Sequence, residues 1–187
     1  MTARFEMTGT ALEGLVKLKR LPIADNRGFF QRMFDLDELA QMGWKSAVKQ
    51  INHTKTLQIG SLRGMHMQLP PYSEFKLVSC LHGRVFDVVV DLRAESNTFL
   101  QTFGMTLDSR ENTALLIPPG FAHGFQTLTN DVEMLYVHSE QFHPEADFVT
   151  QALDPLLKIE WPLPVAERSE RDRKASLLDQ RFKGFKL

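Results

Sequence analysis

The 187-residue sequence is short of cysteine and contains neither a long apolar run nor an excess of one charge. A single cysteine, Cys80, excludes an intrachain disulfide, and its apolar surroundings predict a buried, unreactive thiol. The net charge of −1 gives no overall attraction for nucleic acid or for an anionic membrane. Any anionic ligand must therefore be held by local arginine and lysine side chains.

No targeting segment is expected from this sequence. Charged side chains interrupt residues 1–21, which lack the apolar stretch of a signal peptide, and no segment is apolar enough to span a bilayer. A cytoplasmic protein is therefore expected. The content of 43% hydrophobic and 24% charged residues is ordinary for a globular protein. The length predicts one domain over residues 1–187, with a tail of short helices from about residue 154.

Short strand-like segments separated by turn residues fill most of the chain and predict an all-β sandwich or barrel. Segments 75–81 and 84–93 predict a hairpin that turns at His82-Gly83. The clearest helix of the first half is expected over residues 36–42, with Asp35 as its cap, and a second short helix is expected from Ser169. The expected strands are 12–19, 29–34, 48–53, 57–68, 75–81, 84–93, 101–107, 113–118, 124–128 and 132–138.

Titratable side chains recur at strand positions, where a face that closes a core would be apolar. Strand alternation places His66 on one face, Lys76 on the face of Val78 and Cys80, and Tyr136 on the face of His138. The set predicts strands that line a polar pocket, although alternation alone does not say which face is the cavity. A bulge at Gly64 would let Arg63 and His66 point into one site.

The order and spacing of these motifs resemble one family, the nucleotide-sugar 3,5-epimerases that act on dTDP-4-dehydro-6-deoxyglucose in dTDP-rhamnose biosynthesis. The resemblance covers about residues 15–178. It is carried by 25–30 (DNRGFF), 50–52 (QIN), 63–68 (RGMHMQ), 75–78 (FKLV), 83–93 (GRVFDVVVDLR), 117–125 (IPPGFAHGF), 154–155 (DP), 159–162 (IEWP) and 169–172 (SERD).

The resemblance implies a cupin-type β jelly roll, a homodimer that exchanges strands, and no metal or organic cofactor. It implies that His66 removes the proton next to the ketone, Asp172 pairs with His66, Lys76 stabilises the enolate oxygen, and Tyr136 is the acid on the opposite ring face. The residues that the resemblance implies for substrate binding are Arg27, Gln31, Gln50, Asn52, Arg63, His123 and Phe142.

These residue types suit the chemistry. A proton next to a ketone is removed only if the enolate is stabilised, and a preorganised cation at its oxygen contributes roughly 3–4 kcal/mol. A histidine base adds about 10²–10⁴ in rate, and a carboxylate partner fixes its tautomer. Inversion needs a second group that returns the proton from the other face, and a guanidinium suits diphosphate oxygens.

The sequence departs from the family pattern in the pocket. Met67 replaces an aromatic residue, Gln31 replaces a glutamate, and Val137 replaces a lysine. Segment 141–153 departs most, because Phe142 is the only aromatic residue left of a pair and bulkier residues replace two glycines. The sugar, the nucleotide base, and the choice between C3, C5 or both positions therefore stay open.

Two other functions are compatible with the same residues. A metal-dependent cupin enzyme could use Glu74 and His123 as ligands, although Gln68 stands where such proteins carry a second histidine. A nucleotide-sugar-binding jelly roll with altered or no catalysis is the other alternative. The remaining histidines, His53, His82, His138 and His143, are expected to have no chemical role, and Asp87 and Asp91 are expected either to be solvated or to hold Lys76 or a histidine.

Overall fold

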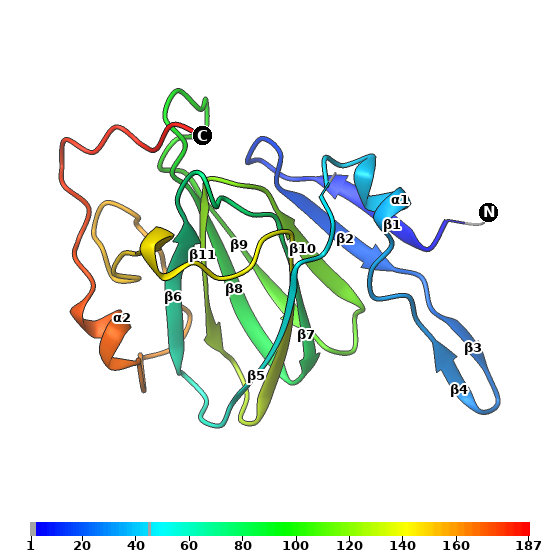
Figure 1. Cartoon of the computed structure of the whole chain (residues 1–187). Helices are drawn as coiled ribbons and strands as arrows, with labels where there is room; N and C mark the ends of the chain where they lie inside the picture. The colour runs from blue at the N-terminus through cyan, green and yellow to red at the C-terminus, as the bar shows by residue number, and fades with distance from the viewer. Residues whose placement is uncertain (1–2, 45) are drawn as a thin grey trace.

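In the computed structural model, which describes residues 3–44 and 46–187, two antiparallel sheets face each other (Figure 1). The six-stranded sheet has the order β1 (Phe5–Gly9), β2 (Val16–Arg20), β10 (Thr113–Ile117), β7 (Lys76–His82), β12 (Val132–His138) and β5 (Gln50–Thr56). The five-stranded sheet has the order β13 (Asp147–Val149), β6 (Leu62–Gln68), β11 (Phe121–Thr127), β8 (Arg84–Asp91) and β9 (Thr102–Asp108). This mostly β jelly-roll sandwich confirms the expected fold class.

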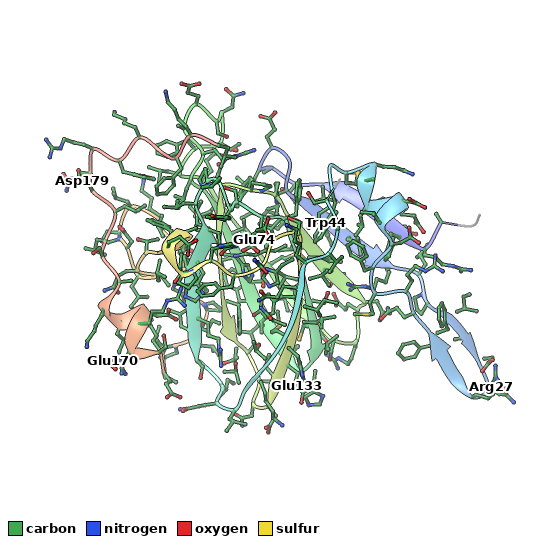
Figure 2. All side chains as sticks on the ribbon, viewed as in Figure 1. Arg27, Trp44, Glu74, Glu133, Glu170 and Asp179 are labelled. Carbon is green, nitrogen blue, oxygen red and sulfur yellow. The ribbon has the colours of Figure 1, made fainter. Side chains whose placement is uncertain are left out.

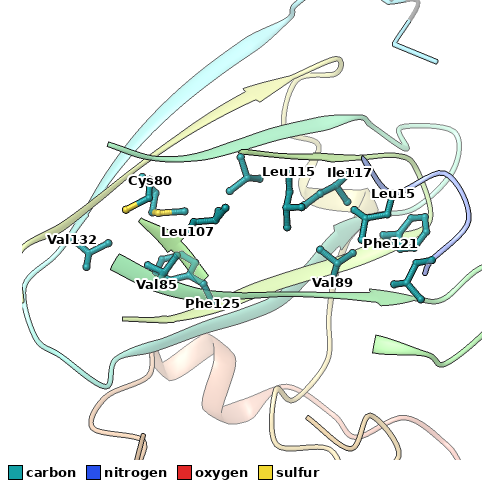
Figure 3. Packing of buried hydrophobic residues seen from close by; sticks show 13 residues of the cluster. Leu15, Cys80, Val85, Val89, Leu107, Leu115, Ile117, Phe121, Phe125 and Val132 are labelled. Atoms are coloured by element: carbon teal, nitrogen blue, oxygen red, sulfur yellow. The ribbon is translucent and has the colours of Figure 1, made fainter. Parts of the chain in front are cut away.

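The space between the sheets is filled by apolar side chains that alternate along both sets of strands (Figure 3). Val85, Val89 and Phe125 come from the five-stranded sheet, and Leu115 and Cys80 come from the six-stranded sheet. Burial raises the pKa of the Cys80 thiol to about 11, so the thiol stays protonated. The predicted burial of Cys80 is confirmed.

The outer faces of both sheets are also covered. Helix α1 (Leu36–Ala40) and Trp44 pack on the outer face of the six-stranded sheet, together with Leu77. The C-terminal tail packs on the outer face of the five-stranded sheet, where it meets Met65 and Met67. Because Met65, Met67 and Leu77 point outward, strand alternation turns His66 and Lys76 into the space between the sheets. The structure thus decides the question that alternation left open.

The predicted hairpin of segments 75–81 and 84–93 is wrong. β7 pairs with β10 and β12, whereas β8 pairs with β9 and β11, so the two strands belong to different sheets. Gly83, with φ +77°, lets the chain cross from one sheet to the other. Sequence spacing resembled a hairpin because a short turn between two strands looks the same whether the strands pair or pass to facing sheets.

The two predicted helix caps are confirmed. The Asp35 side chain accepts hydrogen bonds from the backbone amides of Asp37 and Glu38 at the start of α1. The Ser169 side chain accepts one from the backbone amide of Asp172 at the start of α2 (Glu170–Lys174). The second cap fixes the first turn of α2 and with it the position of Asp172.

The predicted bulge at Gly64 is also confirmed. On β6, Arg63 and His66 are three residues apart, but their partners on β11, Phe125 and His123, are only two apart. A Cβ atom at Gly64 would lie 2.6 Å from the Gly124 Cα atom, and Gly64 has φ +128°. Only glycine fits this close approach of the two strands.

A two-stranded hairpin, β3 (Ile23–Asp25) and β4 (Gly28–Phe30), projects away from both sheets (Figure 1). Its apolar side chains are exposed, with Phe29 at 69% and Phe30 at 59% of their full accessibility. Within the described residues, no helix is long and apolar enough to cross a membrane.

Candidate active site

Three adjoining hollows are all lined by His66. The one lined by His66, Lys76 and Tyr136 has a volume of about 330 Å³ and is called the catalytic hollow below. A larger one, of about 550 Å³, carries Arg63 and Lys55 and is called the basic hollow. The third, of about 180 Å³, is lined by both Lys76 and Phe142.

His66 forms a dyad with Asp172, as the resemblance implied. The His66 Nε2 atom lies 2.7 Å from the Asp172 Oδ1 atom. The other carboxylate oxygen, Oδ2, accepts a hydrogen bond of 3.3 Å from the Gly64 backbone amide. The bulge on β6 and the capped first turn of α2 therefore bring together two residues that are 106 positions apart in the sequence.

The environment of Asp172 favours its ionised form. Burial by itself would raise the pKa of Asp172, but the hydrogen bonds from His66 and the Gly64 amide lower it below its usual value. The ionised carboxylate holds a proton on Nε2 of His66 and leaves Nδ1 as the nitrogen that is available to a substrate. This is the tautomer that a base facing the hollow needs.

Lys76 and Tyr136 come from the opposite wall. Both belong to the six-stranded sheet, whereas His66 belongs to the five-stranded sheet, and all three line the catalytic hollow. The Lys76 Nζ atom lies 3.3 Å from the Glu74 Oε1 atom and donates a hydrogen bond of 3.3 Å to the His66 backbone carbonyl. Since an ammonium group has three N–H donors, a third is available to a substrate oxygen.

Tyr136 is a neutral phenol in this environment. Burial raises the pKa of Tyr136, and the negative charge of Asp87 raises it further. The side chain therefore carries the proton that an acid must deliver. Arg63 opposes the shift and is the nearby cation that favours the phenolate left after the proton has been given away.

His123 lies beside Tyr136 with its ring held by a buried carboxylate. Its Nε2 atom lies 2.9 and 3.0 Å from the two carboxylate oxygens of Asp87. Burial raises the pKa of Asp87, and the contact with His123 opposes this rise. Of the two interpretations of Asp87, the one in which it holds a histidine is confirmed. Asp91, by contrast, accepts hydrogen bonds from Arg93 at the far end of β8.

The chain is similar throughout its length to enzymes of one kind. The sequence profile of the dTDP-4-dehydrorhamnose 3,5-epimerase family matches residues 9–180. The chain belongs to this family. The dTDP-4-dehydrorhamnose 3,5-epimerase of Salmonella typhimurium is 38% identical over 173 residues, which cover 91% of this chain and 94% of that protein.

Two crystal structures of epimerases show the same fold. The dTDP-6-deoxy-D-glucose-3,5-epimerase of Legionella pneumophila, in complex with dTDP-4-keto-L-rhamnose, has a TM-score of 0.89 at 34% identity and covers 98% of this chain and 99% of that one. A 3′-monoepimerase from Streptomyces bikiniensis, in complex with dTDP-quinovose, has a TM-score of 0.83 at 30% identity and covers 90% and 85% of the two chains. This member of the epimerase family is therefore an isomerase.

Most of the predicted substrate-binding residues lie around the hollows. Gln50 and Phe142 line the smallest hollow, Asn52 lines this and the catalytic hollow, and Arg63 lines the catalytic and basic hollows. Segment 141–143 is held in place by Gln68, whose amide group accepts from the His143 backbone and donates to the Gln141 carbonyl. Gln68 therefore has a structural task in this epimerase.

Arg27 and Gln31 lie elsewhere. Arg27 is at the tip of the projecting hairpin, where its side chain is 85% exposed and its guanidinium group lies 2.6 Å from the Asp25 carboxylate (Figure 2). Gln31 follows directly after β4 on the same arm, and neither residue lines any of the three hollows. Within a single chain, neither residue is therefore placed to contact a ligand in these hollows.

Sequence reasoning gave no role to His138, and it considered Glu74 only as a metal ligand. Both side chains are largely buried and line the smallest hollow, with His138 Nδ1 at 2.8 Å from Glu74 Oε2. The signal for His138 was its position two residues after Tyr136, on the same face of one strand. Arg171 was also missed; it lines all three hollows and contacts the Asp147 carboxylate.

The two residues considered as metal ligands do not converge. Glu74 contacts Lys76 and His138, whereas His123 contacts Asp87. Across residues 3–44 and 46–187, no group of three His, Cys, Asp or Glu side chains has the arrangement of a metal site. The two candidate ligands therefore belong to separate pairs.

Proposed function

We propose that this protein is a 3,5-epimerase of a dTDP-4-keto-6-deoxy sugar and acts in the biosynthesis of dTDP-rhamnose or of a related deoxysugar. One observation supports this proposal above the others. A histidine–carboxylate dyad and a neutral phenol line one hollow from two opposite sheets, with a lysine beside them. Removal of a proton from one ring face and its return on the other require such an arrangement.

The proposed reaction proceeds in two proton transfers at each centre. His66 takes the proton from the carbon next to the ketone through Nδ1, and the electron pair of the broken C–H bond forms an enolate. The Lys76 ammonium group stabilises the charge on the enolate oxygen. Tyr136 then gives its proton to the opposite face of the same carbon, so the new C–H bond has the inverted configuration, and Arg63 favours the resulting phenolate.

The diphosphate of the substrate is assigned to Arg63. This side chain lines both the catalytic hollow and the basic hollow, so it lies at the junction where the sugar would meet the rest of the nucleotide. A guanidinium group matches two phosphate oxygens at once. Asn52 and Gln50 line the sugar side of the junction and supply amide groups to hydroxyl or keto oxygens.

We also propose that the protein is a homodimer in which each projecting hairpin completes the partner's site. The exposed Ile23, Phe29 and Phe30 make the hairpin an apolar arm in an isolated chain, and such surface is usually covered by a partner. A two-fold symmetric pair would exchange the arms reciprocally. Arg27 and Gln31 would then reach the partner's nucleotide.

Mixed dimers test whether the hairpin of one chain completes the site of its partner. Arg27→Ala and His66→Ala should each inactivate the protein when present in both chains. Unfolding and refolding the two variants together should restore activity, because one of the two sites in a mixed dimer then carries both wild-type residues. If Arg27→Ala is inactive alone and the mixture stays inactive although mixed dimers form, Arg27 acts within its own chain. An active Arg27→Ala protein would show that Arg27 has no role in the reaction.

The number of inverted centres is tested directly by solvent exchange. NMR of dTDP-4-keto-6-deoxyglucose with the protein in D₂O should show deuterium entering at both C3 and C5. His66→Ala should abolish the exchange, whereas His53→Ala, at an exposed histidine that pairs with Glu133, should not. Exchange at C3 alone would assign the activity of a monoepimerase. Binding without any exchange would reject the epimerase and leave a nucleotide-sugar-binding protein.

A further inference from the structure

A chain of hydrogen bonds crosses the wall of the site and ends at Lys76. The Phe142 backbone amide donates to Gln50 Oε1 at 2.9 Å, and Gln50 Nε2 donates to Asn52 Oδ1 at 3.1 Å. Asn52 Nδ2 lies 3.3 Å from His138 Nε2. The other ring nitrogen, Nδ1, lies 2.8 Å from Glu74 Oε2, and Glu74 Oε1 lies 3.3 Å from Lys76 Nζ.

The two ends of this chain fix its direction. A backbone amide can only donate, and a carboxylate can only accept. Gln50 must therefore turn its oxygen to Phe142 and its nitrogen to Asn52, and Asn52 must turn its nitrogen to His138. His138 then accepts at Nε2 and donates from Nδ1 to Glu74. Only the neutral Nδ1–H tautomer of His138 satisfies every link.

The negative charge of Glu74 is therefore paired with the Lys76 ammonium group. Both side chains are largely buried, and Figure 2 labels Glu74 near the middle of the molecule. A buried ammonium group needs a partner to stay charged and in place. The carboxylate supplies one contact to Lys76, and the neutral His138 fixes the other oxygen of the same carboxylate.

We propose that Glu74 and His138 are positioning residues, which hold the Lys76 ammonium group toward the substrate's ketone oxygen through this directional chain of hydrogen bonds. Neither residue needs to touch the reacting atoms. The series of hydrogen bonds begins at Phe142, which lines the smallest hollow, and ends at the Lys76 ammonium group. The proposal rests on the proposed function for the role of Lys76, whereas the tautomer of His138 does not depend on it.

The first test is the protonation of the His138 ring. Long-range ¹H–¹⁵N NMR of histidine-labelled protein at neutral pH should show His138 as the Nδ1–H tautomer, with its signal assigned by its loss in His138→Asn. In Glu74→Gln, the amide oxygen faces the Lys76 ammonium group and the NH₂ group faces His138. Both ring nitrogens then face NH₂ groups, because Asn52 also turns its nitrogen to the ring, so His138 should lose its preference for the Nδ1–H tautomer. An imidazolium ring or an Nε2–H tautomer in the unmodified protein would overturn the chain.

The second test is kinetic. Misplacement of a catalytic group by about 1 Å can cost about 100-fold, so Glu74→Gln should lower kcat by about 10–100-fold with KM nearly unchanged. The matched control is Glu133→Gln, which changes a half-buried carboxylate 3.1 Å from His53, outside all three hollows, and should keep full activity. Circular dichroism and thermal melting must show that both variants fold. A Glu74→Gln protein that is folded and keeps its full kcat would refute the positioning role.

A pair of variants at His138 keeps the proposal testable if Glu74→Gln does not fold. His138→Asn retains a donor near the position of Nδ1, whereas His138→Leu leaves Glu74 without one. The asparagine variant should keep more of kcat than the leucine variant, and equal kcat values would count against the proposal. If the unmodified protein shows no solvent exchange at all, the proposed function fails, and the tautomer measurement still decides whether the chain exists.

Discussion

Replacement of Asp172 by asparagine should disable the base while leaving the fold in place. The Asp172 carboxylate has one oxygen 2.7 Å from His66 Nε2 and the other 3.3 Å from the Gly64 backbone nitrogen. Because the Gly64 amide can only donate, the asparagine oxygen must face Gly64, and its NH₂ group must face His66. His66 then has to accept at Nε2 and carry its proton on Nδ1, where the substrate would meet an N–H group in place of a lone pair.

The expected loss follows from this tautomer. The same substitution in the Ser-His-Asp triad lowers kcat about 10⁴-fold through the same change of tautomer, which corresponds to about 5 kcal/mol in the barrier. Asp172→Ala places no donor against Nε2, so His66 can still adopt the active tautomer. The alanine variant should therefore exchange deuterium faster than the asparagine variant, although an asparagine is closer in shape to aspartate.

Deuterium incorporation from D₂O, measured by NMR on the keto sugar, is the assay. Asp108→Asn is the matched control, because it also replaces a paired carboxylate, which lies 2.6 Å from Arg110 and outside all three hollows. The reasoning is refuted if folded Asp172→Asn exchanges within about tenfold of the unmodified protein, since a base in the wrong tautomer costs far more. It is also refuted if the asparagine variant is faster than the alanine variant.

Three further predictions follow from the same structure. Tyr136→Phe should block inversion more than exchange, because His66 can still remove and return a proton on its own face; equal loss of both, measured by NMR, would show that Tyr136 only positions the substrate. Gly64→Ala should lower the free energy of unfolding by about 1–3 kcal/mol, because position 64 has a positive φ and the new Cβ atom would collide with Gly124. Gly9→Ala is the control, since nothing lies within 4 Å of its new Cβ atom, and urea unfolding measures the free energy of unfolding of both variants. Folding lowers the pKa of Asp172, so the ionised carboxylate stabilises the fold at any pH above the pKa that this group has in the unfolded chain. This stabilisation is lost as the pH falls through the lower pKa of Asp172 in the folded protein. The stability gap between the protein and Asp172→Asn should therefore narrow below about pH 4, and a gap that is constant with pH would contradict the lowered pKa.

The Glu74–His138 pair shows where sequence reasoning stops. Alternation placed His138 on the face of Tyr136, but it could not show that Glu74 lies 2.8 Å from its ring. The two residues are 64 positions apart, on neighbouring segments of a sheet whose strand order is far from the order along the chain. The hairpin of β7 and β8 was predicted wrongly for the same reason. Turn residues indicate that the chain changes direction, but they do not indicate which strand the next strand pairs with.

Local physical chemistry was enough for several features of this protein. The sequence by itself determined where most strands run, the caps at Asp35 and Ser169, the bulge at Gly64 and the burial of Cys80, since each depends on neighbours within a few residues or on polarity alone. The catalytic set of His66, Lys76, Tyr136 and Asp172 was proposed from the sequence through resemblance to a family.

Only the tertiary structure decided which face of each strand is interior and which side chains meet there. Burial of Leu77 under α1 and of Met65 under the C-terminal tail turned the polar faces of β6 and β7 toward each other. The same packing left the arm with Arg27 outside the site of its own chain. Alternation makes the two faces of a strand different, but only the layers packed on each side determine which of them encloses a cavity.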